Sequence, residues 1–139
     1  MIHILIVENG GSVTKDLGKA NTWGDIGIDM EIDTVADGNG CILEVRHKDY
    51  DILIIDLCLP DMNGLHLIKK VERISPGILT IILAEQGTIE KSLEDFDFEA
   101  SEYLVKPVSV ESVMNSIARG LKKQSQKRKT MRRDLKRTL

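Results

Sequence analysis

The sequence predicts an α/β protein in which helices cover both faces of a parallel β-sheet. Short apolar runs alternate with helix-like segments along the chain. The runs are rich in the branched residues typical of strands that are buried on both faces, and Gly or Pro punctuates the connections. With 139 residues, 42% hydrophobic and 29% charged, the chain has the size and composition of one globular domain with its own core.

Five segments have the character of strands. Four are dominated by apolar residues, whereas the second alternates apolar and acidic residues from Ile28 to Asp33. That alternation is typical of a strand with one wet face or at an exposed edge of the sheet. The predicted strands are Ile2–Val7, Ile28–Ala36, Asp51–Leu57, Ile78–Ala84 and Tyr103–Val105.

Helical segments are predicted near residues 12–21, 39–48, 64–74 and 88–98, with a last one from about residue 110. The last has the clearest pattern, with Ser109 as its predicted N-cap and an apolar face at helical spacing. That face consists of Val110, Val113, Met114, Ile117, Ala118 and Leu121. The first has the weakest pattern because Gly18 interrupts it, and glycine costs roughly 1 kcal/mol in a helix interior.

Charge divides the chain into an acidic body and a basic tail. Residues 1–121 contain 10 Lys/Arg and 21 Asp/Glu, a balance of −11, whereas residues 122–139 contain 9 Lys/Arg and only Asp134, a balance of +8. We therefore expect one domain over 1–121 and a basic C-terminal tail or helix extension over 122–139. The tail could contact a polyanion, begin an output module, or be a solvated end.

Cysteine usage and hydropathy bear on location. Cys41 and Cys58 have no metal-ligand spacing and are too few for a disulfide scaffold. No apolar stretch approaches the length of a transmembrane segment, and Met1–Val7 lacks the basic start and cleavage site of a secretory signal. We expect a cytoplasmic protein.

Polar residues follow several of the predicted strands. Because parallel strands end at the same edge of a sheet, where open α/β sheets bind ligands, these residues should surround one shallow pocket. They are Glu8 and Asn9 after the first strand, Asp56 near the end of the third and Lys106 after the fifth, and the apolar Ala84 at the end of the fourth strand completes the set. Carboxylate and other oxygen ligands suit Mg²⁺, and a lysine opposite them suits a phosphoryl group.

These segments together resemble the receiver domain of bacterial two-component response regulators. The resemblance covers about residues 2–121 and rests on Ile4–Glu8, Asp51–Gly64 and Tyr103–Pro107 in this order and spacing. It implies a flavodoxin-like, doubly wound parallel sheet of five strands in the order 2-1-3-4-5. The alternating second strand would then lie at an edge, as its own pattern indicates.

The resemblance also implies a phosphoryl-acceptor site. Asp56 would accept a phosphoryl group from a histidine kinase or a phosphotransfer protein in a phosphorelay. The domain would catalyse only its own Mg²⁺-dependent phosphorylation. Mg²⁺ would be bound by the Asp56 carboxylate, the backbone carbonyl of Cys58, the Asn9 side chain and, through water, Glu8.

Further roles follow from the same resemblance. Lys106 would pair with the phosphoryl oxygens, with a cis peptide bond between Lys106 and Pro107. Ala84 and Tyr103 occupy the switch positions. The output surface, and a possible homodimer interface, would be the face formed by the fourth helix, fifth strand and fifth helix.

Two residues depart from the family pattern. The family usually has a second acidic residue where this chain has Asn9, and a Thr or Ser where it has Ala84. The first change predicts weak Mg²⁺ binding, and the second removes a hydroxyl that normally contacts the phosphoryl group. The alternative function is therefore a pseudo-receiver, a binding module of the same fold that acts without phosphorylation.

Overall fold

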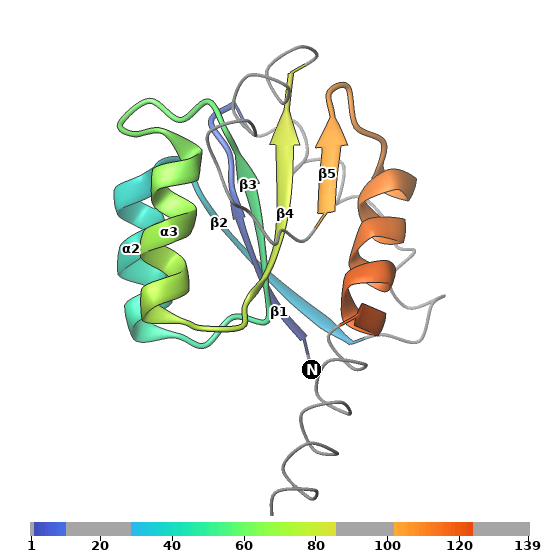
Figure 1. The fold of residues 1–139 in the computed structure, drawn as a ribbon, viewed down its shortest axis with the longest axis horizontal. Coiled ribbons are helices and arrows are strands. Elements are labelled where there is room, and N and C mark those ends of the chain that lie inside the picture. Colours follow the sequence, from blue (N-terminus) through green and yellow to red (C-terminus); the bar gives the residue numbers. More distant parts are fainter. Residues whose placement is uncertain (1, 11–28, 86–101, 124–139) are drawn as a thin grey trace, which may run out of the picture.

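The computed structural model of the protein describes residues 2–10, 29–85 and 102–123. Its sheet has five parallel strands in the order β2-β1-β3-β4-β5, which confirms the predicted fold and strand order (Figure 1). The strands are β1 (Ile2–Val7), β2 (Met30–Val35), β3 (Ile52–Asp56), β4 (Leu79–Ala84) and β5 (Glu102–Val105). The helices predicted near 12–21 and 88–98, and residues 124–139 of the tail, lie outside the described residues.

The strand predictions differ from the structure only at the ends. β3 is one residue shorter at each end than predicted, and β2 begins at Met30. β2 lies at the edge of the sheet and pairs with β1 along its whole length, from Ile2 opposite Met30 to Val7 opposite Val35. The alternating acidic pattern of β2 therefore correctly indicated an edge strand.

Successive residues of the central strands enter two separate hydrophobic cores, because side chains of a strand point alternately to opposite faces. One core lies against the helices α2 (Gly38–His47) and α3 (Gly64–Ile74), and the other against the helix of residues 110–123 (Figure 1). The first core includes Leu5, Val7, Leu53, Ile55, Cys41 and Val71. The second includes Ile4, Ile6, Ile52, Ile54, Val113 and Ile117.

Side chains cap the start of each helix that the structure describes. Asp37 accepts a hydrogen bond from the Gly40 N–H (2.7 Å), and Asn63 accepts one from the Leu65 N–H (2.8 Å). Ser109, the predicted N-cap of the last helix, accepts one from the Ser112 N–H (3.1 Å). Each bond satisfies an N–H that has no partner within its helix. Within the described ranges, no helix combines the length and apolar character needed to cross a bilayer.

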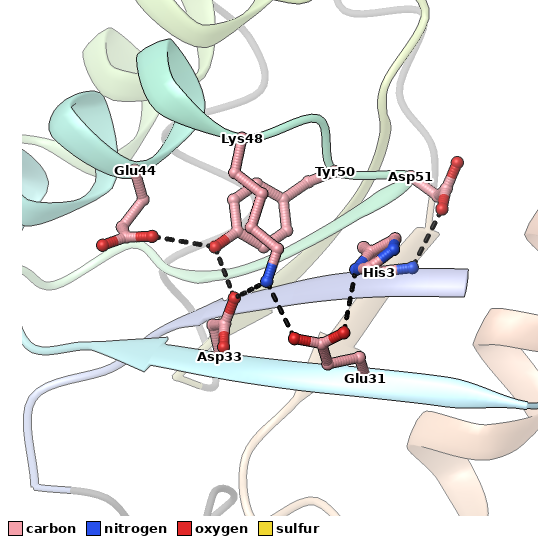
Figure 2. Close-up of polar contacts among 7 residues, drawn as sticks. All are labelled: His3, Glu31, Asp33, Glu44, Lys48, Tyr50 and Asp51. Atoms are coloured by element: carbon pink, nitrogen blue, oxygen red, sulfur yellow. Dashed lines mark hydrogen bonds and ion pairs between the residues drawn. The ribbon is translucent and has the colours of Figure 1, made fainter. Parts of the chain in front are cut away.

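A polar cluster joins β2 to the C-terminal end of α2 (Figure 2). Lys48 Nζ lies 2.7 Å from Asp33 Oδ2 and 2.9 Å from Glu31 Oε1. The hydroxyl of buried Tyr50 lies 2.7 Å from Asp33 Oδ2 and 3.0 Å from Glu44 Oε2, so its single hydrogen is shared between two carboxylates. The sequence predicted the acidic edge but not these contacts.

This cluster makes stability depend on pH. The hydrogen bonds from Lys48 and Tyr50 lower the pKa of Asp33, so the stabilisation is complete above its unfolded pKa of about 3.9 and is lost as pH falls through the lower folded value. We expect Asp33→Asn to be less stable than the wild type in urea denaturation at pH 7. The two proteins should converge toward pH 3.

The control is Asp49→Asn, which changes an exposed carboxylate close in sequence to the cluster. It should match the wild type at both pH values. A deficit for Asp33→Asn that is the same at pH 7 and pH 3 would show that the ionised carboxylate is not the source of the stabilisation.

Candidate functional site at the carboxyl ends of the strands

Asp56 is a buried carboxylate at the end of a buried strand. It is the last residue of β3, all five residues of which are buried, and it is 3% exposed. Burial of a charge is costly unless the charge is paired and hydrogen-bonded. Both oxygens of Asp56 have partners, since Oδ2 contacts Lys106 Nζ and Oδ1 accepts a hydrogen bond from the Cys58 N–H (3.0 Å).

Lys106 reaches Asp56 from the far side of β4. Its N–H donates to the Ala84 carbonyl (2.8 Å), which extends the pairing of β4 with β5, and the Lys106–Pro107 peptide bond is cis. Burial disfavours the charged amine, but the hydrogen bond to Asp56 and the negative charges of Asp56, Glu8 and Glu85 outweigh burial and raise the pKa of Lys106. Lys106 is therefore a cation at neutral pH.

Glu8 and Asn9 follow β1 at the same edge of the sheet. Glu8 is buried, and its N–H donates to the Val35 carbonyl (3.0 Å), whereas Asn9 is exposed. The charge of Glu8 acts on Lys106, which places this carboxylate near the Asp56–Lys106 pair.

The donor set fits Mg²⁺ by its chemistry. Carboxylate, amide and backbone oxygens are the ligands that this hard cation prefers. Among the residues that the structure describes, no three His, Cys, Asp or Glu side chains converge as a metal cluster. Of the residues predicted to bind the metal, two are carboxylates, Glu8 and Asp56, so a metal held by this set would also depend on the Asn9 amide and the Cys58 carbonyl.

A closed loop follows Asp56. The Gly64 N–H donates to the Leu57 carbonyl (3.1 Å), and Cys58 and Asn63 form an isolated antiparallel bridge. The backbone is so close here that a Cβ on Gly64 would lie 2.8 Å from Leu57 Cα and 2.9 Å from the Asp56 carbonyl oxygen. The loop therefore returns to β3 directly beside the buried carboxylate.

The two switch positions have different surroundings. Ala84 ends β4 and is buried, and as an alanine it brings no hydroxyl to the site. Tyr103 lies on β5 opposite Ile82 and packs partly buried against the core under α2 and α3, where burial raises its pKa. The structure thus brings Asp56, Lys106 and Ala84 to one edge and places Tyr103 in the neighbouring core.

Sequence reasoning gave no role to Asp61, in the loop after Asp56. Its Oδ1 accepts from the Gly38 N–H (2.9 Å) and its Oδ2 from the Asn39 N–H (3.0 Å), both at the start of α2. The partners are more than 20 positions away, so no local spacing pattern could have revealed them.

Comparisons with known proteins identify the family of the chain. The response regulator receiver domain model matches residues 4–118. Response regulator ArlR of Staphylococcus haemolyticus is 31% identical over 91% of this chain and 56% of its own length. The chain therefore spans little more than half of this relative.

Solved structures show the same fold. Chemotaxis response regulator CheY4 of Vibrio cholerae aligns with a TM-score of 0.72 and 26% identity, over 86% of this chain and 98% of its own. A CheY-like receiver domain protein of Methanospirillum hungatei aligns with a TM-score of 0.75 and 23% identity, over 91% and 98% of the two chains. The chain belongs to the receiver domain family of two-component response regulators.

The closed loop gives a testable requirement for glycine at position 64. We expect Gly64→Ala to lower the free energy of unfolding by about 1–3 kcal/mol, because the added methyl group would overlap backbone atoms. Urea denaturation measures this change. Gly40→Ala, also in the first turn of a helix, is the control, since its nearest atoms are side-chain atoms at 3.1 Å or more. Equal losses in both variants would contradict the close packing of the loop.

Proposed function

We propose that this domain is a phosphorylation-dependent switch in which Asp56 accepts a phosphoryl group from a histidine kinase or a phosphotransfer protein. The observation that supports it most directly is the buried Asp56 carboxylate in contact with the Lys106 cation at the carboxyl ends of parallel strands. Membership of the receiver family supports phosphoryl transfer, rather than a purely structural ion pair, as the role of these two residues.

In the proposed reaction, a carboxylate oxygen of Asp56 forms a bond to phosphorus while the bond between phosphorus and the donor nitrogen breaks. The histidine regains its electron pair, and the product is an aspartyl phosphate. Lys106 would exchange its contact with Asp56 Oδ2 for a phosphoryl oxygen and stabilise the charge there. The Cys58 N–H would keep the other carboxylate oxygen in place.

Mg²⁺ is the proposed cofactor. The Asp56 carboxylate, the Cys58 backbone carbonyl and the Asn9 side chain would bind it, with Glu8 acting through water. When bound, it would neutralise negative charge on the transferring phosphoryl group. The exposure of Asn9 and its lack of charge support weak binding.

The proposed output surface includes β5 and the helix of residues 110–123. Val105 is 47% exposed there, and Glu102 forms ion pairs with Arg119 (3.3 Å) and Lys123 (3.1 Å). Phosphorylation would shift this face, and Tyr103 beside it, between two populations, and a homodimer could form through it. The predicted fourth helix lies outside the described residues.

Ala84 and Asn9 favour a second candidate, a pseudo-receiver that binds its partner without phosphorylation. Buried Ala84 supplies no hydroxyl at the end of β4, where phosphate would be coupled to Tyr103. This candidate predicts the same fold and no covalent change at Asp56, so one measurement separates the two.

We also propose a cytoplasmic location and a polyanion contact for the tail of residues 122–139. Cys41 and Cys58 are both free thiols, which supports a reducing, cytoplasmic setting. The charge of +8 over residues 122–139 supports a salt-sensitive contact with a polyanion.

The decisive measurement is the intact mass after incubation with acetyl phosphate and Mg²⁺. We expect the wild type and Asp49→Asn to gain one phosphate, and Asp56→Asn to gain none, because the amide cannot act as the acceptor. An unmodified wild type at saturating donor would favour the pseudo-receiver. Equal labelling of Asp56→Asn would place the acceptor elsewhere.

The metal proposal is tested at position 9. One charge pair at about 5 Å and an effective dielectric of 20 is worth roughly 3 kcal/mol, and repulsion among carboxylates in the empty site cancels part of it. We therefore expect Asn9→Asp to tighten Mg²⁺ binding by about tenfold, or 1.4 kcal/mol, in calorimetric titration. Asn115→Asp, on an exposed residue of the helix of residues 110–123, is the control and should change the affinity much less. Unchanged affinity in Asn9→Asp would show that residue 9 is not a ligand.

A further inference from the structure

We propose that Asp61 is a positioning residue for the phosphoryl-acceptor site, because it fixes the loop after Asp56 to the start of α2. This inference rests on the proposed function, since the groups that the loop positions are those that would hold the acceptor carboxylate and the metal.

The first observation is a two-pronged contact between the loop and the helix. Asp61 Oδ1 accepts from the Gly38 N–H (2.9 Å) and Oδ2 from the Asn39 N–H (3.0 Å). N–H groups in the first turn of a helix have no partners within the helix and carry a partial positive charge, so a carboxylate is well suited to this position. These hydrogen bonds lower the pKa of Asp61, which keeps it ionised at neutral pH.

The second observation is the packing beside this contact. Met62 lies so close to Gly38 that a Cβ on Gly38 would be 2.5 Å from Met62 Sδ. The tip of the loop therefore rests directly against the first turn of α2, and the hydrogen bonds and the packing hold the same two segments together.

The third observation connects the tip of the loop to the reacting group. Cys58, three residues before Asp61, donates its N–H to Asp56 Oδ1 and presents the backbone carbonyl proposed to bind the metal. The base of the loop is fixed by the Gly64–Leu57 hydrogen bond and the Cys58–Asn63 bridge. Asp61 fixes the tip of the loop, so the loop that carries Cys58 is restrained at both its base and its tip.

The chain offers a matched control in Asp37. Its carboxylate accepts from the Gly40 N–H (2.7 Å) at the same helix start, and this bond lies within the α2 cap. Removal of either carboxylate deprives the first turn of α2 of an acceptor, but only removal of Asp61 releases the loop. Asp37→Ala therefore reports the effect of a weakened helix start alone.

The experiment compares Asp61→Ala, Asp61→Asn and Asp37→Ala with the wild type, each as the full chain. Calorimetric titration gives the Mg²⁺ affinity, and intact mass over time gives the rate of phosphorylation by acetyl phosphate at limiting and saturating Mg²⁺. We expect Asp61→Ala to bind Mg²⁺ about tenfold more weakly, as is common when a group supporting a ligand is removed. Its phosphorylation should be slow at limiting Mg²⁺ and largely recover at saturation.

The other variants separate positioning from stability. Asp61→Asn keeps one acceptor oxygen, so its Mg²⁺ affinity should lie between those of the wild type and Asp61→Ala. If Asp61→Ala does not fold, the affinity of Asp61→Asn tests the positioning role. Asp37→Ala should be less stable in urea, with wild-type Mg²⁺ affinity. Two results would overturn the positioning role: wild-type Mg²⁺ affinity in both Asp61 variants, or a loss of affinity in Asp37→Ala equal to that in Asp61→Ala. If the wild type is still phosphorylated, the proposed function stands in either case. A wild type that neither binds Mg²⁺ nor gains phosphate would overturn both.

Discussion

The structure at the carboxyl-terminal ends of the strands depends on the burial of one side-chain carboxylate. Asp56 ends a strand whose residues are all buried, and its charge is compensated by Lys106 and by the Cys58 N–H. Removal of one partner from a buried ion pair typically costs about 3–5 kcal/mol, because the other charge is then left uncompensated. β4 lies between β3 and β5, so Lys106 must extend across the end of β4. Ala84 is the last residue of β4, and its carbonyl accepts the N–H of Lys106.

Helix α2 contacts both the site at the carboxyl ends of the strands and the edge strand β2. Its first turn receives the loop that follows Asp56, through Gly38 and Asn39. Its last turns meet the edge strand β2, where Glu44 and Lys48 join the cluster around Asp33 and Tyr50 (Figure 2). A displacement of α2 would therefore change contacts both with the loop that follows Asp56 and with β2.

The sequence predicted those features that a local pattern encodes. The run of branched apolar residues at 52–55 indicated β3, the alternation in β2 indicated an edge, and a helix was predicted near residues 64–74, where α3 lies. The contacts of Asp61 and of Tyr50 were missed because their partners are distant in sequence or belong to another element. In the sequence, a loop carboxylate that will find a partner looks the same as one that remains solvated. The site was predictable to the extent that the parallel sheet places strand ends together; the roles of its residues came from the resemblance.

Charge balance explains why this site would need a cation besides Lys106. In the structure Asp56 and Lys106 form an ion pair, and the charges of Glu8 and Glu85 also act on Lys106. A phosphoryl group on Asp56 would replace one negative charge with up to two, close to Glu8, and Lys106 can neutralise only one of them. With an acidic residue at position 9 the excess would be larger before the reaction and would bind Mg²⁺ more strongly. Under the proposed function, Asn9 would lower that excess, and the site would then require a higher concentration of the metal than one with an acidic residue at position 9.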